Sequence, residues 1–359
     1  MKRNILLSLF ALCVAFVSFA QDDAVPKVQN NKAYLVYGVA FYNLENLFDT
    51  INNNGKYDYE FSPDGPRGWD SERYWSKINN LARSISHMTT PETPYGPAII
   101  GVSEIENKGV LDDLVMADSI KQWNLQVIHH DSPDRRGVDV GLLYSPYFFK
   151  PIDVTNHTLC VPDDPDFLTR DQMCVTGVMG GDTLSVIVNH WPSRLGGKER
   201  SSYLRETAAR LSKHIADSLW AIRPNQGVII MGDLNDDPHD KSCAVALGAK
   251  RDATDLAPHG FYNPWWRLLE SGVGTLSYRG AWNLFDQIIV SGTLMGPNYD
   301  HLHYWNCIIN DFDFLYQQDG PYKGTPLRTY GSGKWLNGYS DHFPTEIFLI
   351  KEKKLTRNK

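Results

Sequence analysis

Six short groups of residues combine carboxylates, amides and imidazoles, the side chains that bind metal ions and transfer protons. They are Asn43-Leu44-Glu45-Asn46, Val102-Ser103-Glu104, Asn189-His190-Trp191-Pro192-Ser193-Arg194, Gly232-Asp233-Leu234-Asn235, Asn283-Leu284-Phe285-Asp286-Gln287 and Ser340-Asp341-His342. Mg²⁺ prefers hard oxygen ligands, typically one or two carboxylates together with water and a substrate phosphate. An imidazole, with an unperturbed pKa of about 6.5, can transfer protons near neutral pH. The six groups therefore predict a site that binds a hard cation and a phosphate and activates water.

Most of the six groups follow an apolar run that is typical of a β-strand. These runs are rich in Val, Ile, Leu and Tyr and are bounded by Gly, Pro, Asn or Asp. They occupy residues 33–42, 98–102, 125–129, 138–144, 173–178, 184–188, 227–231, 284–290 and 346–350. Because such a strand delivers its last side chain to one edge of a sheet, we expect the groups to meet there.

Helical periodicity appears between some of the predicted strands. In residues 199–220 one apolar stripe repeats every three or four positions, through Leu204, Ala208, Leu211, Ile215 and Leu219. Residues 69–88 and 108–120 are shorter candidate helices. The continuous apolar run at residues 228–231 indicates a strand buried on both faces, as in a sheet covered by helices. Periodicity alone indicates an α/β or α+β protein.

The first twenty residues predict a signal peptide. Lys2 and Arg3 are basic, residues 5–19 are almost wholly apolar, and Ser18-Phe19-Ala20 is a small-x-small cleavage site. No later run reaches the roughly 20 apolar residues that a membrane-spanning helix needs. We therefore expect an exported protein, periplasmic or extracellular, whose mature chain begins at Gln21.

Without Lys2 and Arg3 the chain has 33 basic and 42 acidic residues, a formal net charge of −9. Tight binding of duplex nucleic acid depends on Lys and Arg neutralising phosphates. An acidic chain must instead hold a phosphate substrate through a local basic patch and a metal. We expect no stable complex with nucleic acid, and a monomer.

Four cysteines remain in the mature chain: Cys160, Cys174, Cys243 and Cys307. No pairing of them with each other or with histidine has the spacing of a zinc site. Either Cys160 and Cys174 close a hairpin as a disulfide, which export permits, or all four are buried thiols.

In their order along the chain, the six groups resemble the endonuclease/exonuclease/phosphatase superfamily. It includes pancreatic deoxyribonuclease, abasic-site endonucleases, sphingomyelinases and inositol-polyphosphate phosphatases. The resemblance extends over residues 34–348. It implies an α/β (α+β) fold, a four-layer sandwich of two stacked mixed β-sheets flanked by helices. With no internal repeat or linker in view, we expect a single domain over residues 21–359.

The resemblance also implies a magnesium-dependent enzyme, with Mn²⁺ or Ca²⁺ as possible substitutes. Glu104 matches the metal-binding glutamate of the family. Asn43 would supply a neutral oxygen near the same cation, and Asp341 would face the metal. Glu45 would either reach a second cation or be a surface acid.

The catalytic residues follow from the same match. Asp233 would orient or deprotonate the attacking water, and Asn235 would bind a phosphate oxygen. His190 would contact the scissile phosphate, and either His190 or His342 would handle the proton of the leaving oxygen. Asp286 would fix the tautomer of His342.

Arg136 and Arg194 are the candidate substrate-binding residues. Arg136 could hold a phosphate through two hydrogen bonds, and Arg194 would either form a local basic patch with Lys198 or be solvated. Trp282, close to Asp286, would either stack on a base or sugar or pack in the core.

The resulting interpretation is an exported Mg²⁺-dependent phosphoric ester hydrolase, a nuclease that cleaves DNA or RNA by in-line attack of water. One alternative is a sphingomyelinase-like or phosphoinositide-type lipid phosphodiesterase or phosphatase, with an apolar loop at residues 261–266 reaching a bilayer. A second is a non-catalytic binding module on the same scaffold, which would need neither Asp233 nor His342.

Overall fold

Two large mixed β-sheets contain most strands of this computed structural model, which describes residues 33–51 and 58–353. The first sheet has the strand order β14-β17-β1-β2-β4-β3, and the second has the order β5-β6-β7-β8-β13-β10-β9. Strands of the first sheet are β1 (Tyr34–Leu47), β2 (Ile99–Ile105), β3 (Gln126–His129), β4 (Asp139–Tyr144), β14 (His303–Ile309) and β17 (Thr345–Glu352). Strands of the second are β5 (Phe149–His157), β6 (Gln172–Met179), β7 (Asp182–His190), β8 (Gly227–Asp233), β9 (Ala249–Lys250), β10 (Phe261–Tyr262) and β13 (Asp286–Ser291). Two hairpins lie apart from them, β11 (Leu276–Tyr278) with β12 (Ala281–Asn283), and β15 (Tyr330–Gly331) with β16 (Lys334–Trp335).

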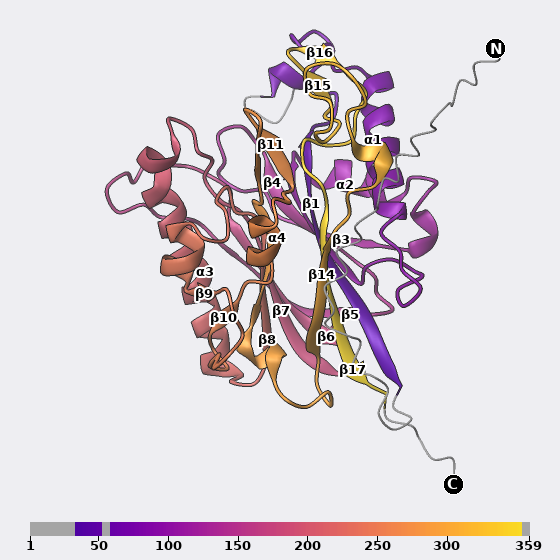
Figure 1. Ribbon diagram of the computed structural model, residues 1–359. Helices are drawn as coiled ribbons and strands as arrows, with labels where there is room; N and C mark the ends of the chain where they lie inside the picture. The colour runs from indigo at the N-terminus through magenta and orange to yellow at the C-terminus, as the bar shows by residue number, and fades with distance from the viewer. Residues whose placement is uncertain (1–32, 52–57, 354–359) are drawn as a thin grey trace, which may run out of the picture. The chain divides into compact units, whose positions relative to one another are not determined.

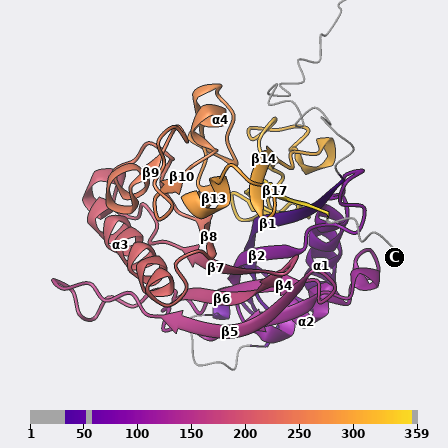
Figure 2. The ribbon, with the colours of Figure 1, turned by 90° about the horizontal axis from the view of Figure 1, so that it is seen from below.

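Helices cover the outer faces of both sheets (Figures 1 and 2). The α-helices are α1 (Ser71–Ser86), α2 (Lys108–Val115), α3 (Lys198–Ile222) and α4 (Trp266–Glu270). Short helices are η1 (Tyr59–Phe61), η2 (Lys121–Trp123), the π-helix η3 (Ser242–Leu247), η4 (Gly292–Met295) and η5 (Asp313–Leu315). In the part of the chain that the structure describes, no helix is both long enough and apolar enough to cross a membrane. The expected four-layer arrangement, helices on two stacked sheets, is confirmed.

The strands alternate their side chains between two apolar layers, as a period of two requires. In β8, Ile229 and Met231 belong to the core between the two sheets. The intervening Val228 and Ile230 pack instead against α3, which contributes Ile215 to the outer layer. Strand β1 alternates in the same way toward α1 and α2. Burial on both faces explains why these strands are continuously apolar in the sequence.

All nine predicted strands are present, with shifted ends. The predicted helix over residues 108–120 is too long, because α2 ends at Val115. Strands β5 and β14 were not predicted. Strand β5 is largely exposed and contains Pro151, and β14 is interrupted by a register shift, so neither has a regular apolar alternation. The expected signal peptide, residues 1–20, lies outside the described residues.

The four cysteines in the described part of the chain are all free thiols. Cys174 pairs with Thr155 across the β5–β6 ladder and is buried under α3, whereas Cys160 is exposed in the following loop. The disulfide alternative for Cys160 and Cys174 is therefore wrong, and so is the alternative of four buried thiols.

Glu346 is a fully buried acid in β17. Burial raises its pKa to about 8, although a hydrogen bond of 3.3 Å from Asn310 lowers it. A folded pKa above the unfolded value means that the folded state keeps its proton while the unfolded state ionises, so stability falls as the pH rises from about 4.5 to 8. At pH 7 the cost is about 3 kcal/mol.

Glu346→Gln is therefore expected to raise the free energy of unfolding at pH 7–8 and to leave it nearly unchanged near pH 4.5. Urea unfolding across this pH range measures both. Glu92→Gln, in an exposed loop, is the matched control. Equal effects of Glu346→Gln at both pH values would contradict the assignment.

Candidate active site

Three neighbouring strands of the second sheet carry candidate site residues at one edge of the sheet. His190 ends β7, Asp233 ends β8 and Asp286 begins β13. His190 is the parallel partner of Asp233, and Asp233 is the antiparallel partner of Asp286. Gly232 permits this close packing, because a Cβ there would lie 2.1 Å from the carbonyl oxygen of Asn189. Sheet register therefore places three residues far apart in the sequence side by side.

The first sheet contributes Asn43 from β1 and Glu104 from β2, and both strands are irregular there. The β1–β2 register shifts between Asn43 and Leu47, and the β2–β4 register shifts around Glu104. Glu45, Asn46 and Glu104 have φ values of 48°, 52° and 59°, in the left-handed region that non-glycine residues rarely adopt. Bulges of this kind redirect side chains beside active sites, and here one lets the Asn46 backbone N–H donate to Glu104 Oε2 at 3.0 Å.

Glu104, His190 and Asp233 form a cluster that can hold a metal ion. Their ligand atoms lie within 4.8 Å of one another. His190 Nε2 is 3.9 Å from Glu104 Oε1 and 3.5 Å from Asp233 Oδ2. Two carboxylates and an imidazole at this separation are a suitable ligand set for a divalent cation, which would also relieve the repulsion between the carboxylates.

Asp233 is held by two amide groups. Asn43 Nδ2 donates to Asp233 Oδ2 at 3.0 Å, and the backbone N–H of Asn235 donates to Asp233 Oδ1 at 3.0 Å. Burial raises the pKa of Asp233 to about 7, with His342 lowering it and Asp286 and Glu104 raising it. A fixed carboxylate with a pKa near neutrality is suited to accepting a proton from water.

His342 and Asp286 form a short buried pair. His342 Nδ1 lies 2.7 Å from Asp286 Oδ2, and His342 Nε2 lies 3.9 Å from Asp233 Oδ2. Burial lowers the pKa of His342, but Asp286 and Asp233 outweigh it and hold the pKa well above the ordinary value. Ser340 Oγ fixes the loop by donating to the carbonyl of Asn43 at 2.7 Å and accepting from the His342 backbone N–H at 3.1 Å.

The pKa of His190 is shifted in the opposite direction to that of His342. Burial, followed by Arg170, Arg136 and His342, holds its pKa well below the ordinary value. Arg170 was not recognised in the sequence. It is buried and donates to the carbonyls of His190 at 3.1 Å and Trp191 at 2.7 Å. The pocket therefore contains one neutral and one cationic imidazole.

Asp341 does not join the Glu104 cluster. Its carboxylate pairs with the guanidinium of Arg328, whose Nε lies 3.7 Å from Glu45 Oε1. Its pKa is lowered, because His342, Arg328 and Lys77 outweigh the effect of burial. The expectation that Asp341 faces the cation of Glu104 is not met in this arrangement.

Glu45 is a buried residue and not a surface acid. Its Oε2 accepts from the Thr329 backbone N–H at 2.7 Å and lies 3.8 Å from Lys77 Nζ. Burial and Asp341 raise its pKa to about 7, with Lys77 and Arg328 lowering it. Lys77 is a lysine on the apolar face of α1, between Tyr74 and Ile78, and this was the sequence signal that would have found it. Arg328 lies in a loop and gave no such signal.

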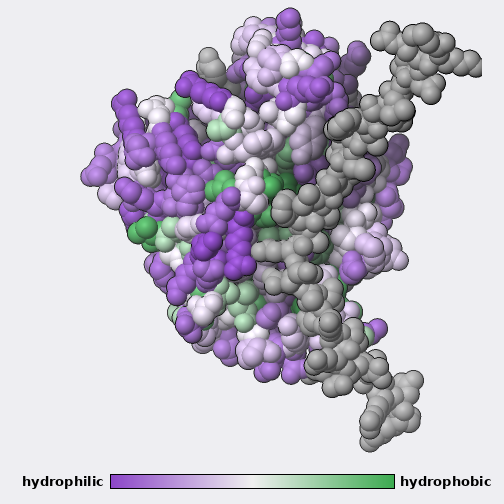
Figure 3. All heavy atoms as spheres, viewed as in Figure 1, coloured by the Kyte–Doolittle hydropathy of each residue, from purple (hydrophilic) through white to green (hydrophobic). Residues whose placement is uncertain are grey.

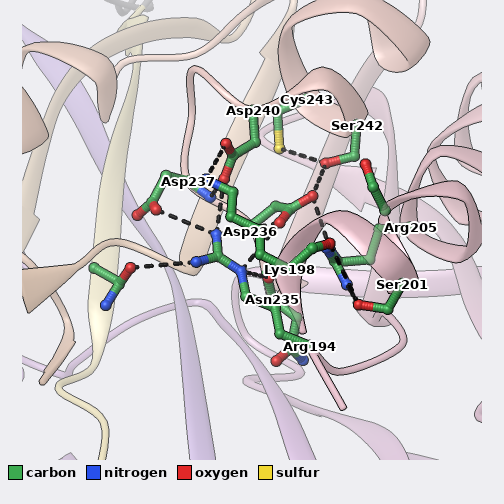
Figure 4. A network of polar contacts seen from close by, with 12 residues as sticks. Arg194, Lys198, Ser201, Arg205, Asn235, Asp236, Asp237, Asp240, Ser242 and Cys243 are labelled. Carbon is green, nitrogen blue, oxygen red and sulfur yellow. Dashed lines mark hydrogen bonds and ion pairs between the residues drawn. The ribbon is translucent and has the colours of Figure 1, made fainter. Parts of the chain in front are cut away.

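Arg194 is committed to carboxylates (Figure 4). Its Nη2 lies 3.1 Å from Asp236, 3.2 Å from Asp237 and 2.7 Å from Asp240, and its Nε donates to the carbonyl of Asn235 at 2.9 Å. This differs from the expected phosphate-binding role. The guanidinium braces the turn that carries Asn235.

Arg194→Gln is expected to lower the free energy of unfolding by about 2 kcal/mol, because it leaves three carboxylates without a shared cation. The KM for a phosphodiester is expected to change by less than about twofold. Thermal unfolding and steady-state kinetics measure the two quantities. Arg210→Gln, at an exposed position of α3, is the matched control. A large rise in KM at unchanged stability would restore Arg194 as a substrate ligand.

The remaining candidates lie at the rim. Arg136 is half exposed, donates to Asn46 Oδ1 and lies 3.9 Å from Glu104 Oε2, so it borders the cluster. Asn235 is half-buried, and its Nδ2 donates to the Trp191 carbonyl at 3.1 Å.

Comparisons with known proteins identify the family of the chain. The sequence matches the model of the Endonuclease/Exonuclease/phosphatase family over residues 38–351. No curated protein matches it.

Several solved structures share the fold. TDP2 of D. rerio, complexed with a single-strand DNA product, is 12% identical with a TM-score of 0.53, over 88% of this chain and 98% of that chain. A mannosyl-6-phosphatase of Bacteroides thetaiotaomicron VPI-5482 is 17% identical with a TM-score of 0.52, over 87% and 99%. A further family protein of Bacteroides thetaiotaomicron is 15% identical with a TM-score of 0.51, over 91% and 99%.

Proposed function

The chain belongs to the endonuclease/exonuclease/phosphatase family, and on this premise we propose that it is a Mg²⁺-dependent phosphodiesterase that cleaves nucleic acid. One observation carries the proposal. Glu104, His190 and Asp233 converge within 4.8 Å, beside the 2.7 Å pair of His342 and Asp286. A pure binding module would have no use for a buried imidazole–carboxylate pair facing a carboxylate whose pKa is near neutrality.

Asp233 would accept the proton of the attacking water. The amides of Asn43 and Asn235 hold both of its oxygens, so its orientation is fixed before the substrate arrives. Such positioning supplies much of the effect of a general base, because the reacting groups need no further ordering.

His342 would stabilise the negative charge on the phosphate and give its proton to the leaving oxygen. Asp286 keeps it protonated, whereas His190, with its lowered pKa, has no proton to spare at neutral pH. His190 is then a neutral ligand or a hydrogen-bond partner of the phosphate.

Glu104 is the carboxylate that would hold the cation, with the neutral His190 beside it in the same cluster. A divalent ion bound there supplies charge neutralisation and a template for the phosphate. Arg136, at the rim, is the cationic side chain closest to Glu104 in the described part of the chain.

A nucleic-acid substrate is favoured over a lipid. A fold neighbour is complexed with single-strand DNA, although another is a mannosyl-6-phosphatase. The apolar segment that a lipid enzyme would insert is buried: Phe261 is 1% exposed, and Trp265 is 0% exposed and donates to the Ile288 carbonyl at 3.0 Å. On the face drawn in Figure 3, the residues around β11 and β15 are mostly white to purple, with little of the green that marks hydrophobic residues.

A substrate panel tests the proposal: plasmid DNA, a single-stranded oligonucleotide, RNA, sphingomyelin vesicles, phosphoinositide vesicles and methyl p-nitrophenyl phosphate. We expect Mg²⁺-dependent cleavage of nucleic acid that stops when chelator is added. Asp233→Asn, purified in the same way, controls for a contaminating nuclease. Turnover of a lipid alone, or no turnover with any divalent metal, would reject the proposal.

Export is also proposed, on the basic start, apolar run and cleavage site of residues 1–20. Mass spectrometry of the protein from its native host is expected to find a chain that begins at Gln21. Detection of the chain with residues 1–20 still attached would contradict export by this route.

A further inference from the structure

A cavity of about 600 Å³ is lined in part by Asp341, whose Oδ1 lies 3.9 Å from His342 Nε2, and is not used by the mechanism above. It is bounded by the β11–β12 hairpin on one side, by residues 321–328 on the other, and by Asp341, the neighbour of His342. Its size is within the range of about 300–1,000 Å³ that is typical of small-molecule sites. The cavity is therefore well placed to hold the part of a substrate next to the scissile phosphate.

The two walls carry the same pair of side chains, a tyrosine followed directly by a basic residue. One wall has Tyr278 and Arg279, and the other has Tyr322 and Lys323. Tyr278 is 62% exposed and Tyr322 is 38% exposed, so neither ring is used in the core. The Arg279 guanidinium lies 5.2 Å from the centre of the Tyr278 ring. Each wall thus offers an accessible aromatic face next to a positive charge.

Trp282 adds a third aromatic ring to the lining. It stacks on Phe343 with the ring centres 6.0 Å apart and an angle of 23° between the rings. Phe343 is buried and follows His342 directly. The aromatic lining therefore extends from the cavity to the catalytic loop.

The lining is also positive, in contrast to the chain as a whole with its formal net charge of −7. It contains Arg279, Lys323 and Arg328, and its one acidic residue, Asp341, already pairs with Arg328. Among the residues that the structure describes, none forms an ion pair with Arg279 or Lys323, so an anionic group of a ligand can meet them there.

We propose that this cavity binds an unpaired nucleotide that adjoins the scissile phosphate of a single-stranded nucleic acid. The base stacks on the tyrosine rings, and a neighbouring phosphate meets Arg279 and Lys323, the combination of aromatic platforms and positive charge that single strands require. The inference rests on the proposed function. It narrows the substrate of the proposed nuclease to single-stranded nucleic acid.

Binding without turnover tests it. Fluorescence anisotropy in the presence of chelator compares a labelled thymidine octamer with an abasic octamer of the same length. Tyr278→Ala and Tyr322→Ala are expected to weaken binding of the octamer about tenfold and of the abasic probe less than about twofold. Tyr278→Phe and Tyr322→Phe, which keep the ring, are expected to bind both probes as the wild type does.

Arg279→Gln and Lys323→Gln are expected to weaken binding of both probes and to reduce the salt dependence, because they remove contacts to phosphate. Matched controls are Tyr147→Ala, an exposed tyrosine in another loop, and Lys213→Gln on α3. Circular dichroism melting verifies that each variant is folded.

The inference is overturned if the tyrosine variants bind the octamer as the wild type does, or lose equal affinity for both probes. Displacement of the octamer by inositol trisphosphate at lower concentration than by thymidine monophosphate also overturns it. Turnover of methyl p-nitrophenyl phosphate by the wild type, measured separately with Mg²⁺, tests the proposed function. If the wild type does not turn over this substrate, the proposed function fails and the binding result still stands. If it does turn it over and the tyrosine variants bind the octamer as the wild type does, only the proposal for the cavity is rejected.

Discussion

His342→Ala is expected to lower kcat by about 10²–10⁴-fold. The imidazolium is a positive charge and an acid near Asp233, with Nε2 at 3.9 Å from Asp233 Oδ2. Steady-state kinetics on an oligonucleotide or on methyl p-nitrophenyl phosphate measures the loss. The fold should survive, because the ring belongs to a loop and not to a strand of either sheet.

Asp286→Asn is expected to cost nearly as much, because an amide cannot stabilise the imidazolium and selects the wrong tautomer. The double variant should then lose little beyond the worse single variant, since groups that act as a unit are not additive. Independent roles would give multiplicative losses and a lower thermal stability for each variant. Multiplicative losses in this cycle would reject the pair even if both residues proved important.

Glu104→Gln is expected to lower kcat/KM about 10³-fold, several kcal/mol of transition-state stabilisation. The amide keeps the size of the side chain and can still accept from the Asn46 N–H, but it removes the negative charge that a cation requires. Calorimetric titration with Mn²⁺ should show the affinity falling in parallel. This second readout does not depend on turnover.

The control for Glu104→Gln is Glu92→Gln, which removes a carboxylate from an exposed loop and should change neither quantity. Unfolding temperatures of both variants should match the wild type within a few degrees. Wild-type Mn²⁺ affinity and activity in Glu104→Gln would exclude Glu104 as a ligand and point to the Glu45 and Asp341 side of the pocket.

The sequence by itself determined where the main strands and the long helix lie, to within a few residues at their ends. Period-two and continuous apolar runs report directly which residues are buried, so β8 and α3 were predicted nearly to the residue. The resemblance of the six groups to a known superfamily predicted Asp233, Asp286 and His342 as one constellation, and the structure brings them together.

The tertiary structure alone decided which charged side chains form ion pairs with one another. Arg194 and Asp341 were assigned from their types to phosphate and metal, but their partners, Asp240 and Arg328, come from turns that no periodicity predicts. Backbone irregularity was equally invisible, since the positive φ of Glu104 arises from register shifts between strands. Local sequence fixes what a side chain can do, whereas long-range packing fixes its partners and hence its charge. For this reason the sequence predicted the members of the site, and only the fold separated the cationic His342 from the neutral His190.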